Sequence, residues 1–347
     1  MTDQTAELQG LIDGATVDFG GAEYSLEGQV VIPRGKTIKN LRAVVPNWDA
    51  NRRVFLVIDA TGVEIDGLYI NIGDDPSKGN LTTSQALDVT GGRNASLKNI
   101  EVTGKGRGTM IRLFQLYCST VEDIWCHDGQ HDNAGGAEQI IGLWAVYCRK
   151  LAVNRPRVAR LLNDAGRAYG TDGITVSGSV DLQINDAIVE RVGEGIDVSG
   201  SAVNVRVDID GATIIDPDSF GIKYANASQC CTTRDSTVIR AGYAAYEYSG
   251  MSEAGNSALH YGNKLLNCFA LDMCVGNSNW AAQNTAGVRI EQGSYLTSYP
   301  RDVFVDGLTV TGAHKYGALT QINSANTLRN FKSEGETVAE KLGTWLS

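Results

Sequence analysis

The sequence predicts an all-β fold, a solenoid of about ten or more rungs in which short parallel strands coil around one narrow core. Two short phrases recur along the chain, and no helical pattern separates their copies. The first phrase, Asp172–Gly178 (DGITVSG), returns as Glu194–Gly200 (EGIDVSG), and weaker copies follow at Phe220–Tyr224, Ala244–Tyr248 and Ala286–Ile290. Stacked copies of one strand unit would place equivalent residues side by side.

The second phrase reads apolar, any residue, Asn/Asp/Gly, small or apolar, any residue, apolar. Asn, Asp and Gly tolerate left-handed backbone angles, so they can bend one strand into the next without a loop. Apolar residues at every second position would then point into the core. We therefore expect the third positions to stack in one column. The copies begin at Ile38, Ile65, Leu97, Val121, Ile184, Ile209, Thr233, Leu265, Val305 and Leu328.

The chain is predicted to have a cap at each end of the solenoid. Residues 1–29 form an N-terminal cap and entry strand, with a short helix over Thr5–Ile12. Residues 30–332 form the parallel β-helix. Residues 333–347 are predicted to be a C-terminal helix that covers the open end, because four apolar residues fall on one helical face. These are Val338, Leu342, Trp345 and Leu346.

Composition and charge narrow the class of protein. The 347 residues include 40 glycines and 6 prolines, which suits many short strands joined by tight turns. A net charge of −10 and the lack of any Lys/Arg run argue against nucleic-acid binding as the main function. The N-terminus resembles no signal peptide, and no apolar run is long enough for membrane insertion. No Cys/His spacing suggests zinc, and we expect neither a metal nor a cofactor.

The opening rungs carry a family likeness. Leu11–Gly21, Val31–Pro33 and Thr37–Leu41 resemble the first rungs of pectate-lyase-like right-handed parallel β-helices, most of all bacteriophage tailspike depolymerases. The resemblance implies a single-stranded right-handed helix and a homotrimer that binds and cuts a bacterial surface polysaccharide. It also implies a virion-associated protein of the phage tail, or one exported without a Sec signal. The Asn-Thr-Asp, paired-Asp and Gly-His-Gly pattern of polygalacturonases is absent, as is a pectate-lyase calcium cluster.

Three carboxyl groups form the first candidate catalytic site. Stacked copies of the first phrase place Asp172 beside Glu194, about 4.8 Å away, with Asp197 three residues further on. Glycoside hydrolysis needs one protonated acid and one nucleophile or base, and the triad resembles that of hydrolytic tailspikes. The alternative is a structural charge ladder through Asp197, Lys223 and Glu247. In the catalytic interpretation, Lys223 and Glu247 contact the substrate.

A second candidate site follows Trp125. His127 and His131 each precede an aspartate, and Tyr169 and Arg167 lie on the next long excursion, together with Arg157 and Arg160. A histidine base with a tyrosine or arginine partner could deprotonate a uronate, so a polysaccharide lyase or C5-epimerase is a second hypothesis. A polar loop that holds two histidines is the plain alternative.

Aromatic residues in the long excursion 276–302 suit sugar binding, because sugar rings stack on aromatic faces. We assign Trp280, Tyr295 and Tyr299 to substrate binding; packing between rungs or across a trimer interface is the alternative. The leading hypothesis is a polysaccharide depolymerase that acts by carboxylate-mediated hydrolysis. The acidic net charge favours a neutral or weakly charged glycan. A non-catalytic glycan-binding adhesin or tail protein is the third hypothesis.

Overall fold

The protein is a right-handed parallel β-helix, and its chain divides into two compact units, Met1–Ile174 and Thr175–Ser347. No helix among the described residues is long and apolar enough to span a membrane. The computed structural model describes residues 2–15, 17–49, 52–132, 140–168, 170–200, 202–225, 228–249, 260–273, 285–291, 300–320 and 326–342.

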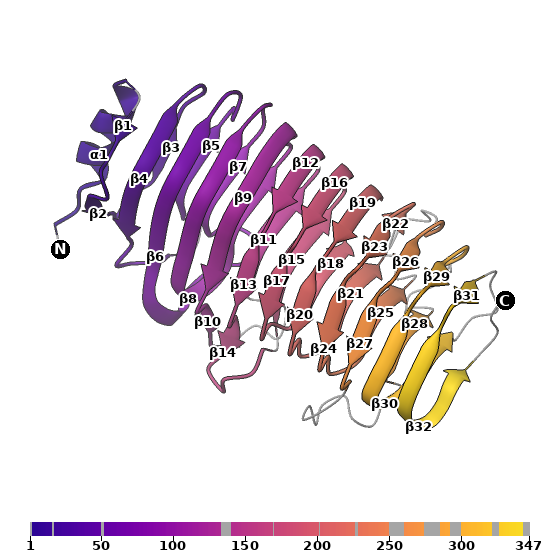
Figure 1. Ribbon diagram of the computed structural model, residues 1–347. Helices are drawn as coiled ribbons and strands as arrows, with labels where there is room; N and C mark the ends of the chain where they lie inside the picture. The colour runs from indigo at the N-terminus through magenta and orange to yellow at the C-terminus, as the bar shows by residue number, and fades with distance from the viewer. Residues whose placement is uncertain are drawn as a thin grey trace. The chain divides into compact units, whose positions relative to one another are not determined.

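The first unit begins with a helix and continues as strands (Figure 1). Its long strands β6 and β8 turn corners of the coil without leaving the sheet. A separate two-stranded sheet joins β10 to β14. The elements are α1 (Thr5–Asp13), β1 (Val17–Asp18), β2 (Glu23–Ser25), β3 (Val30–Ile32), β4 (Thr37–Val44), β5 (Arg53–Ile58), β6 (Glu64–Gly79), β7 (Gln85–Thr90), β8 (Ser96–Phe114), β9 (Tyr117–His127), β10 (Gln130–His131), β11 (Ile140–Val146), β12 (Arg149–Asn154), β13 (Arg157–Ala159) and β14 (Leu162–Asn163).

The second phrase sets the register of the first unit, as predicted. Ile38, Ile65, Leu97 and Val121 pair in parallel across β4, β6, β8 and β9. All four are buried in the core. The third position of each copy has a positive φ of 51–79°. At Gly67 a side chain is also excluded sterically, because a Cβ atom would lie 2.9 Å from the Asn40 side chain.

The predicted N-terminal helix is confirmed as α1, which packs against β2 and β3 (Figure 1). Leu8 and Ile12 are its buried residues. The Gln9 side chain donates to the Val31 carbonyl at 2.9 Å and accepts from the Val31 N–H at 2.7 Å. Gln9 therefore satisfies backbone groups of β3, which limits further strand pairing at this end.

Strand β15 (Thr171–Ser177) carries the chain from the first unit into the second. The second unit consists of strands alone among its described residues. They are β16 (Val180–Asn185), β17 (Ile188–Glu190), β18 (Glu194–Ser199), β19 (Asn204–Asp210), β20 (Thr213–Ile215), β21 (Phe220–Ala225), β22 (Ser228–Gln229), β23 (Thr232–Arg234), β24 (Thr237–Ile239), β25 (Ala244–Ser249), β26 (Lys264–Leu266), β27 (Phe269–Leu271), β28 (Ala286–Glu291), β29 (Phe304–Asp306), β30 (Thr309–Thr320), β31 (Thr327–Arg329) and β32 (Lys332–Leu342).

Both phrases stack in register in the second unit. The first phrase supplies β18, β21, β25 and β28, each pairing in parallel with the next. Copies of the second phrase pair through β16, β19, β23, β26, β29 and β31. The third positions again have positive φ, including 52° at Asp186 and 50° at Asn267. The repeat spacing therefore fixes which side chains become neighbours.

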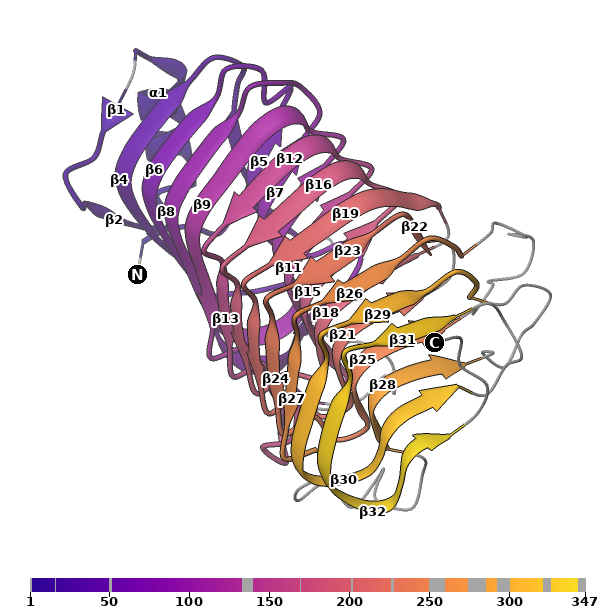
Figure 2. The ribbon, with the colours of Figure 1, turned by 45° about the vertical axis from the view of Figure 1, so that its right-hand side comes forward.

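The predicted C-terminal helix is wrong. Residues Lys332–Leu342 form strand β32, which pairs in parallel with β30 from Thr309 to Leu319 (Figure 2). The open edge of β30 offers a row of backbone hydrogen-bonding groups, and satisfying them outweighs a helical periodicity that is only a weak prior. Trp345 and Leu346, which completed the predicted apolar face, lie outside the described residues.

Candidate functional site

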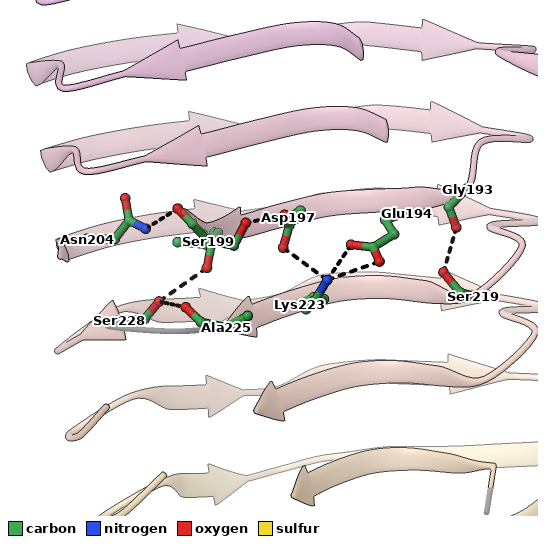
Figure 3. Close-up of polar contacts among 10 residues, drawn as sticks. Gly193, Glu194, Asp197, Ser199, Asn204, Ser219, Lys223, Ala225 and Ser228 are labelled. Carbon is green, nitrogen blue, oxygen red and sulfur yellow. Dashed lines mark hydrogen bonds and ion pairs between the residues drawn. The ribbon is translucent and has the colours of Figure 1, made fainter. Parts of the chain in front are cut away.

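Two of the three predicted catalytic carboxylates meet on one lysine in the second unit (Figure 3). The Lys223 Nζ atom lies 3.0 Å from Glu194 Oε1 and 2.8 Å from Oε2. It also lies 3.7 Å from Asp197 Oδ1. The side chains of Lys223, Glu194 and Asp197 are only 15%, 17% and 7% exposed. The three groups form a compact, largely desolvated ionic cluster.

Strand pairing explains how the sequence builds this cluster. Asp197 on β18 pairs with Lys223 on β21, and Lys223 pairs with Glu247 on β25. Glu247 pairs in turn with Arg289 on β28. Flanking residues such as Ile196 and Val198 are fully buried in the core. The four charged residues therefore form one column of alternating sign, and the predicted ladder through Asp197, Lys223 and Glu247 is confirmed.

The hydroxyl of Ser199 donates a hydrogen bond to Asp197 Oδ2 (Figure 3). The other oxygen, Oδ1, is buried and accepts no hydrogen bond from the residues that the structure describes; it faces Lys223. A buried carboxylate oxygen with only a distant cation is costly, so the lysine charge matters for its stability.

Glu247 is the most deeply buried acid of the column, at 1% exposure. Among the described residues, neither of its oxygens has a hydrogen-bond partner, and Arg289 Nε lies 3.7 Å from Oε2. Burial raises the pKa of Glu247 to about 8, although Arg289 and Lys223 oppose the shift. Glu247 is therefore mostly protonated near neutral pH, unlike a solvent-exposed glutamate.

Asp172, the third predicted catalytic acid, is buried in β15 and belongs to the first unit. The cluster described above consists of residues of the second unit. The expectation that Asp172 lies beside Glu194 stays a prediction.

The second predicted site is partly assembled in the first unit. His127, at the end of β9, has Nδ1 2.7 Å from Asp128 Oδ2 and Nε2 3.2 Å from Glu101 Oε1. Arg160 binds the same Asp128 through two nitrogens, at 2.5 and 2.9 Å. These bonds hold the pKa of Asp128 down at about 2. Because both ring nitrogens face carboxylates, His127 is braced on two sides.

The structure also describes two other residues of the lyase or epimerase hypothesis. His131 lies in β10 and is fully buried. Arg167 is exposed, and its backbone closes a turn with Asn163. Four predicted residues lie outside the described part of the chain, so their roles stay predictions. These are Tyr169, Trp280, Tyr295 and Tyr299.

The sequence interpretation missed Arg289, which completes the column, and Glu101, which binds His127. A signal for Arg289 was present: Ala286–Ile290 was recognised as a copy of the first phrase, and Arg289 occupies the position of Asp197 in that copy. Glu101 had a weaker signal. It belongs to the copy that starts at Leu97, and that register places it beside Trp125.

The first unit contains a second buried ionic cluster that the sequence did not indicate. Asp88 on β7 is completely buried and binds Arg112 on β8 through two bonds, at 2.9 and 2.8 Å. Arg53 Nε on β5 lies 3.1 Å from the same carboxylate. Its two arginines leave the cluster with a net positive charge.

Comparisons with known proteins identify the fold. No protein-family model matches the chain, and no curated protein matches its sequence. Solved structures do match. The A-module of mannuronan C-5 epimerase AlgE4 from Azotobacter vinelandii superposes with a TM-score of 0.61 at 12% identity, covering 99% of this chain and 95% of that one.

Two hydrolases give similar values. Endo-xylogalacturonan hydrolase from Aspergillus tubingensis has a TM-score of 0.63 at 12% identity, with 99% of this chain and 96% of that chain covered. The catalytic domain of a GH87 α-1,3-glucanase has a TM-score of 0.59 at 12% identity, with coverages of 93% and 60%. At this identity the likeness defines the fold class, the right-handed parallel β-helix, and function must be argued from the site.

Proposed function

We propose that the protein is a polysaccharide depolymerase that cleaves a bacterial surface glycan by glycoside hydrolysis. Glu194 and Asp197, with Asp172 as the third member, form the acid/base set. The observation that carries this proposal is the gathering of Glu194 and Asp197 on Lys223 in a nearly desolvated cluster. A cluster that contains so much buried charge is costly to stability, which suits a functional role.

Glu194 and Asp197 are neighbouring carboxylates that share one cation. The ion pairs with Lys223 hold the Glu194 and Asp197 carboxyl groups in position, which suits a nucleophile or a base that activates water. Glu247, two strands from Asp197, is kept protonated by burial, but at 1% exposure it lies in the core and is not part of the acid/base set.

The structural matches support the substrate class. Two of the matched proteins are described as glycan hydrolases and one as an epimerase of mannuronan, and all act on polysaccharides by their descriptions. A parallel β-helix offers an elongated surface of regularly spaced side chains, which suits a polymeric ligand. A homotrimer and attachment to a phage tail remain proposals that the family resemblance suggests; sedimentation velocity would test the trimer.

The test is incubation of the purified protein with a panel of bacterial capsular and exopolysaccharides. Reducing ends and ultraviolet absorbance are recorded together. We expect reducing ends without new absorbance, and we expect Glu194→Gln and Asp197→Asn each to lose at least about a hundredfold in rate. Exposed Glu334 supplies the control Glu334→Gln, which should keep full activity. Unchanged cleavage in both amide variants would refute the assignment.

A second candidate function is lyase or C5-epimerase activity on a uronate polymer through His127. The pairing of His127 with Asp128 and Glu101 favours it, because a carboxylate orients a histidine for proton transfer. A lyase would produce an unsaturated product that absorbs at about 235 nm. An epimerase would change the uronate composition without creating new reducing ends. Either result, if lost in His127→Gln and kept in Glu194→Gln, would replace the hydrolase proposal.

The third candidate is a non-catalytic adhesin. It predicts that the protein binds a glycan of the panel without producing either signal, and that Glu194→Gln and Asp197→Asn leave this binding intact.

A further inference from the structure

Trp125 lies at the centre of a polar column on the first unit. It belongs to β9, and its neighbours in register are Glu101 on β8 and Arg157 on β13. Adjacent parallel strands are about 4.8 Å apart, so the backbones of Glu101 and Arg157 flank the backbone of Trp125 at the spacing of single strands. The column therefore presents an acceptor, an aromatic surface and a donor in a row.

The indole is held in place from one side. The Trp125 and His127 rings stack with centroids 3.9 Å apart and an interplanar angle of 26°. His127 is itself 7% exposed and fixed by Asp128 and Glu101. Trp125 nevertheless remains 39% exposed. A large, braced and exposed aromatic ring is pre-organised to bind a ligand at low entropic cost.

The flanking charges are available as well. Arg157 is exposed and forms no ion pair with any residue that the structure describes. The Glu101 side chain is 38% exposed although it contacts His127. Sugars match this arrangement, because a pyranose has an apolar C–H face for the ring and hydroxyl groups at its edge for a carboxylate and a guanidinium.

We propose that Glu101, Trp125 and Arg157 form a binding subsite for one neutral sugar residue of a polysaccharide. The inference rests on the proposed glycan ligand but not on hydrolysis. A neutral sugar is favoured over an acidic one because the carboxylates of Glu101 and Asp128 balance the cations Arg157 and Arg160 around the ring. His127 acts here as a positioning residue for Trp125 rather than as a base.

Two other aromatic residues, the partly buried Tyr69 and the exposed Phe269, lack these features. Arg42 covers the Tyr69 ring in the same column, with its guanidinium carbon 4.1 Å from the ring centroid. Phe269 in the second unit is 45% exposed, but its neighbours in register are Thr237 and Thr309. Phe269 is therefore the matched control for Trp125. Its exposure is similar, but its described neighbours in register carry no charge and no described histidine ring stacks on it.

The test is affinity electrophoresis of the full chain in gels that contain each neutral and acidic polysaccharide of the panel. All variants carry Glu194→Gln so that cleavage does not change the gel. We expect Trp125→Ala to weaken binding about tenfold or more, Trp125→Phe to restore most of it, and Arg157→Gln to weaken it about threefold to tenfold. Phe269→Ala should bind as the parent does. Circular dichroism confirms that each variant is folded.

Each outcome decides the proposal. Equal loss in Trp125→Ala and Phe269→Ala, unchanged binding in Trp125→Ala, or no binding to any neutral glycan would overturn it. Loss of binding in Trp125→Ala, with Glu194→Gln still cleaving the glycan, would support this subsite and refute the hydrolase assignment. Unchanged binding in Trp125→Ala, together with an inactive Glu194→Gln, would refute this subsite and support the hydrolase assignment.

Discussion

Lys223 binds both carboxylate oxygens of Glu194, with its Nζ atom 3.0 and 2.8 Å away. The two residues lie on adjacent strands but not opposite each other, since the register partner of Lys223 is Asp197. One ammonium therefore serves two carboxylates. This arrangement makes Lys223 the residue on which the charge of the whole cluster depends.

Replacing Lys223 with Met should destabilise the protein strongly. The change leaves Glu194 and Asp197 without their common cation at side-chain exposures of 17% and 7%. Removing one partner from a buried ionic group costs about 3 kcal/mol or more in the free energy of unfolding. Urea unfolding at neutral pH measures the loss. Exposed Lys264 on β26 is the control, and Lys264→Met should change stability by less than about 0.5 kcal/mol.

Glu247 should make stability depend on pH. Burial raises its pKa from 4.5 to about 8, so the folded state holds a proton that the unfolded state releases. Its contribution to stability is therefore complete below about pH 4.5 and is lost as pH rises through about 8. Glu247→Gln mimics the protonated form and should remove this decline. Denaturant unfolding from pH 4 to 9 compares the two proteins, and parallel curves would contradict the burial argument.

The sequence was informative wherever the backbone alone decides position. Asn and Asp at the third position of the repeated phrase indicated left-handed corners, and the observed register follows from stacking those corners. The ladder through Lys223 was predictable for the same reason. The bond from Lys223 to Glu194 was not, because it depends on side-chain conformations across a diagonal. The helix predicted near Val338 failed because an open strand edge competes with local periodicity.

The left-handed corners give a prediction about backbone conformation. Asp235 has a φ of 49°, a region in which β-branched residues are strained. Asp235→Val should therefore lower the free energy of unfolding by about 1–2 kcal/mol. Asp235→Gly should leave it nearly unchanged, because glycine adopts this region freely. Thermal unfolding of the two variants provides the measurement. Equal destabilisation by Val and Gly would show that the aspartate side chain, and not φ, matters at this corner.

Replacing Asp88 should destabilise the protein as much as replacing Lys223, although Asp88 lies outside the proposed catalytic cluster. Its carboxylate is completely buried and holds Arg112 through two bonds and Arg53 at 3.1 Å. In Asp88→Asn, Arg112 keeps one hydrogen-bond acceptor but loses its counter-charge at 16% side-chain exposure. The free energy of unfolding should fall by about 3 kcal/mol. The further change Arg112→Met should recover part of this loss, because the double variant leaves no buried, unpaired charge at the Asp88–Arg112 pair. Urea unfolding of the two single variants and the double variant forms a mutant cycle. Additive losses would mean that Asp88 and Arg112 do not stabilise each other, and the cluster would then have to be explained by the role of Arg53 alone.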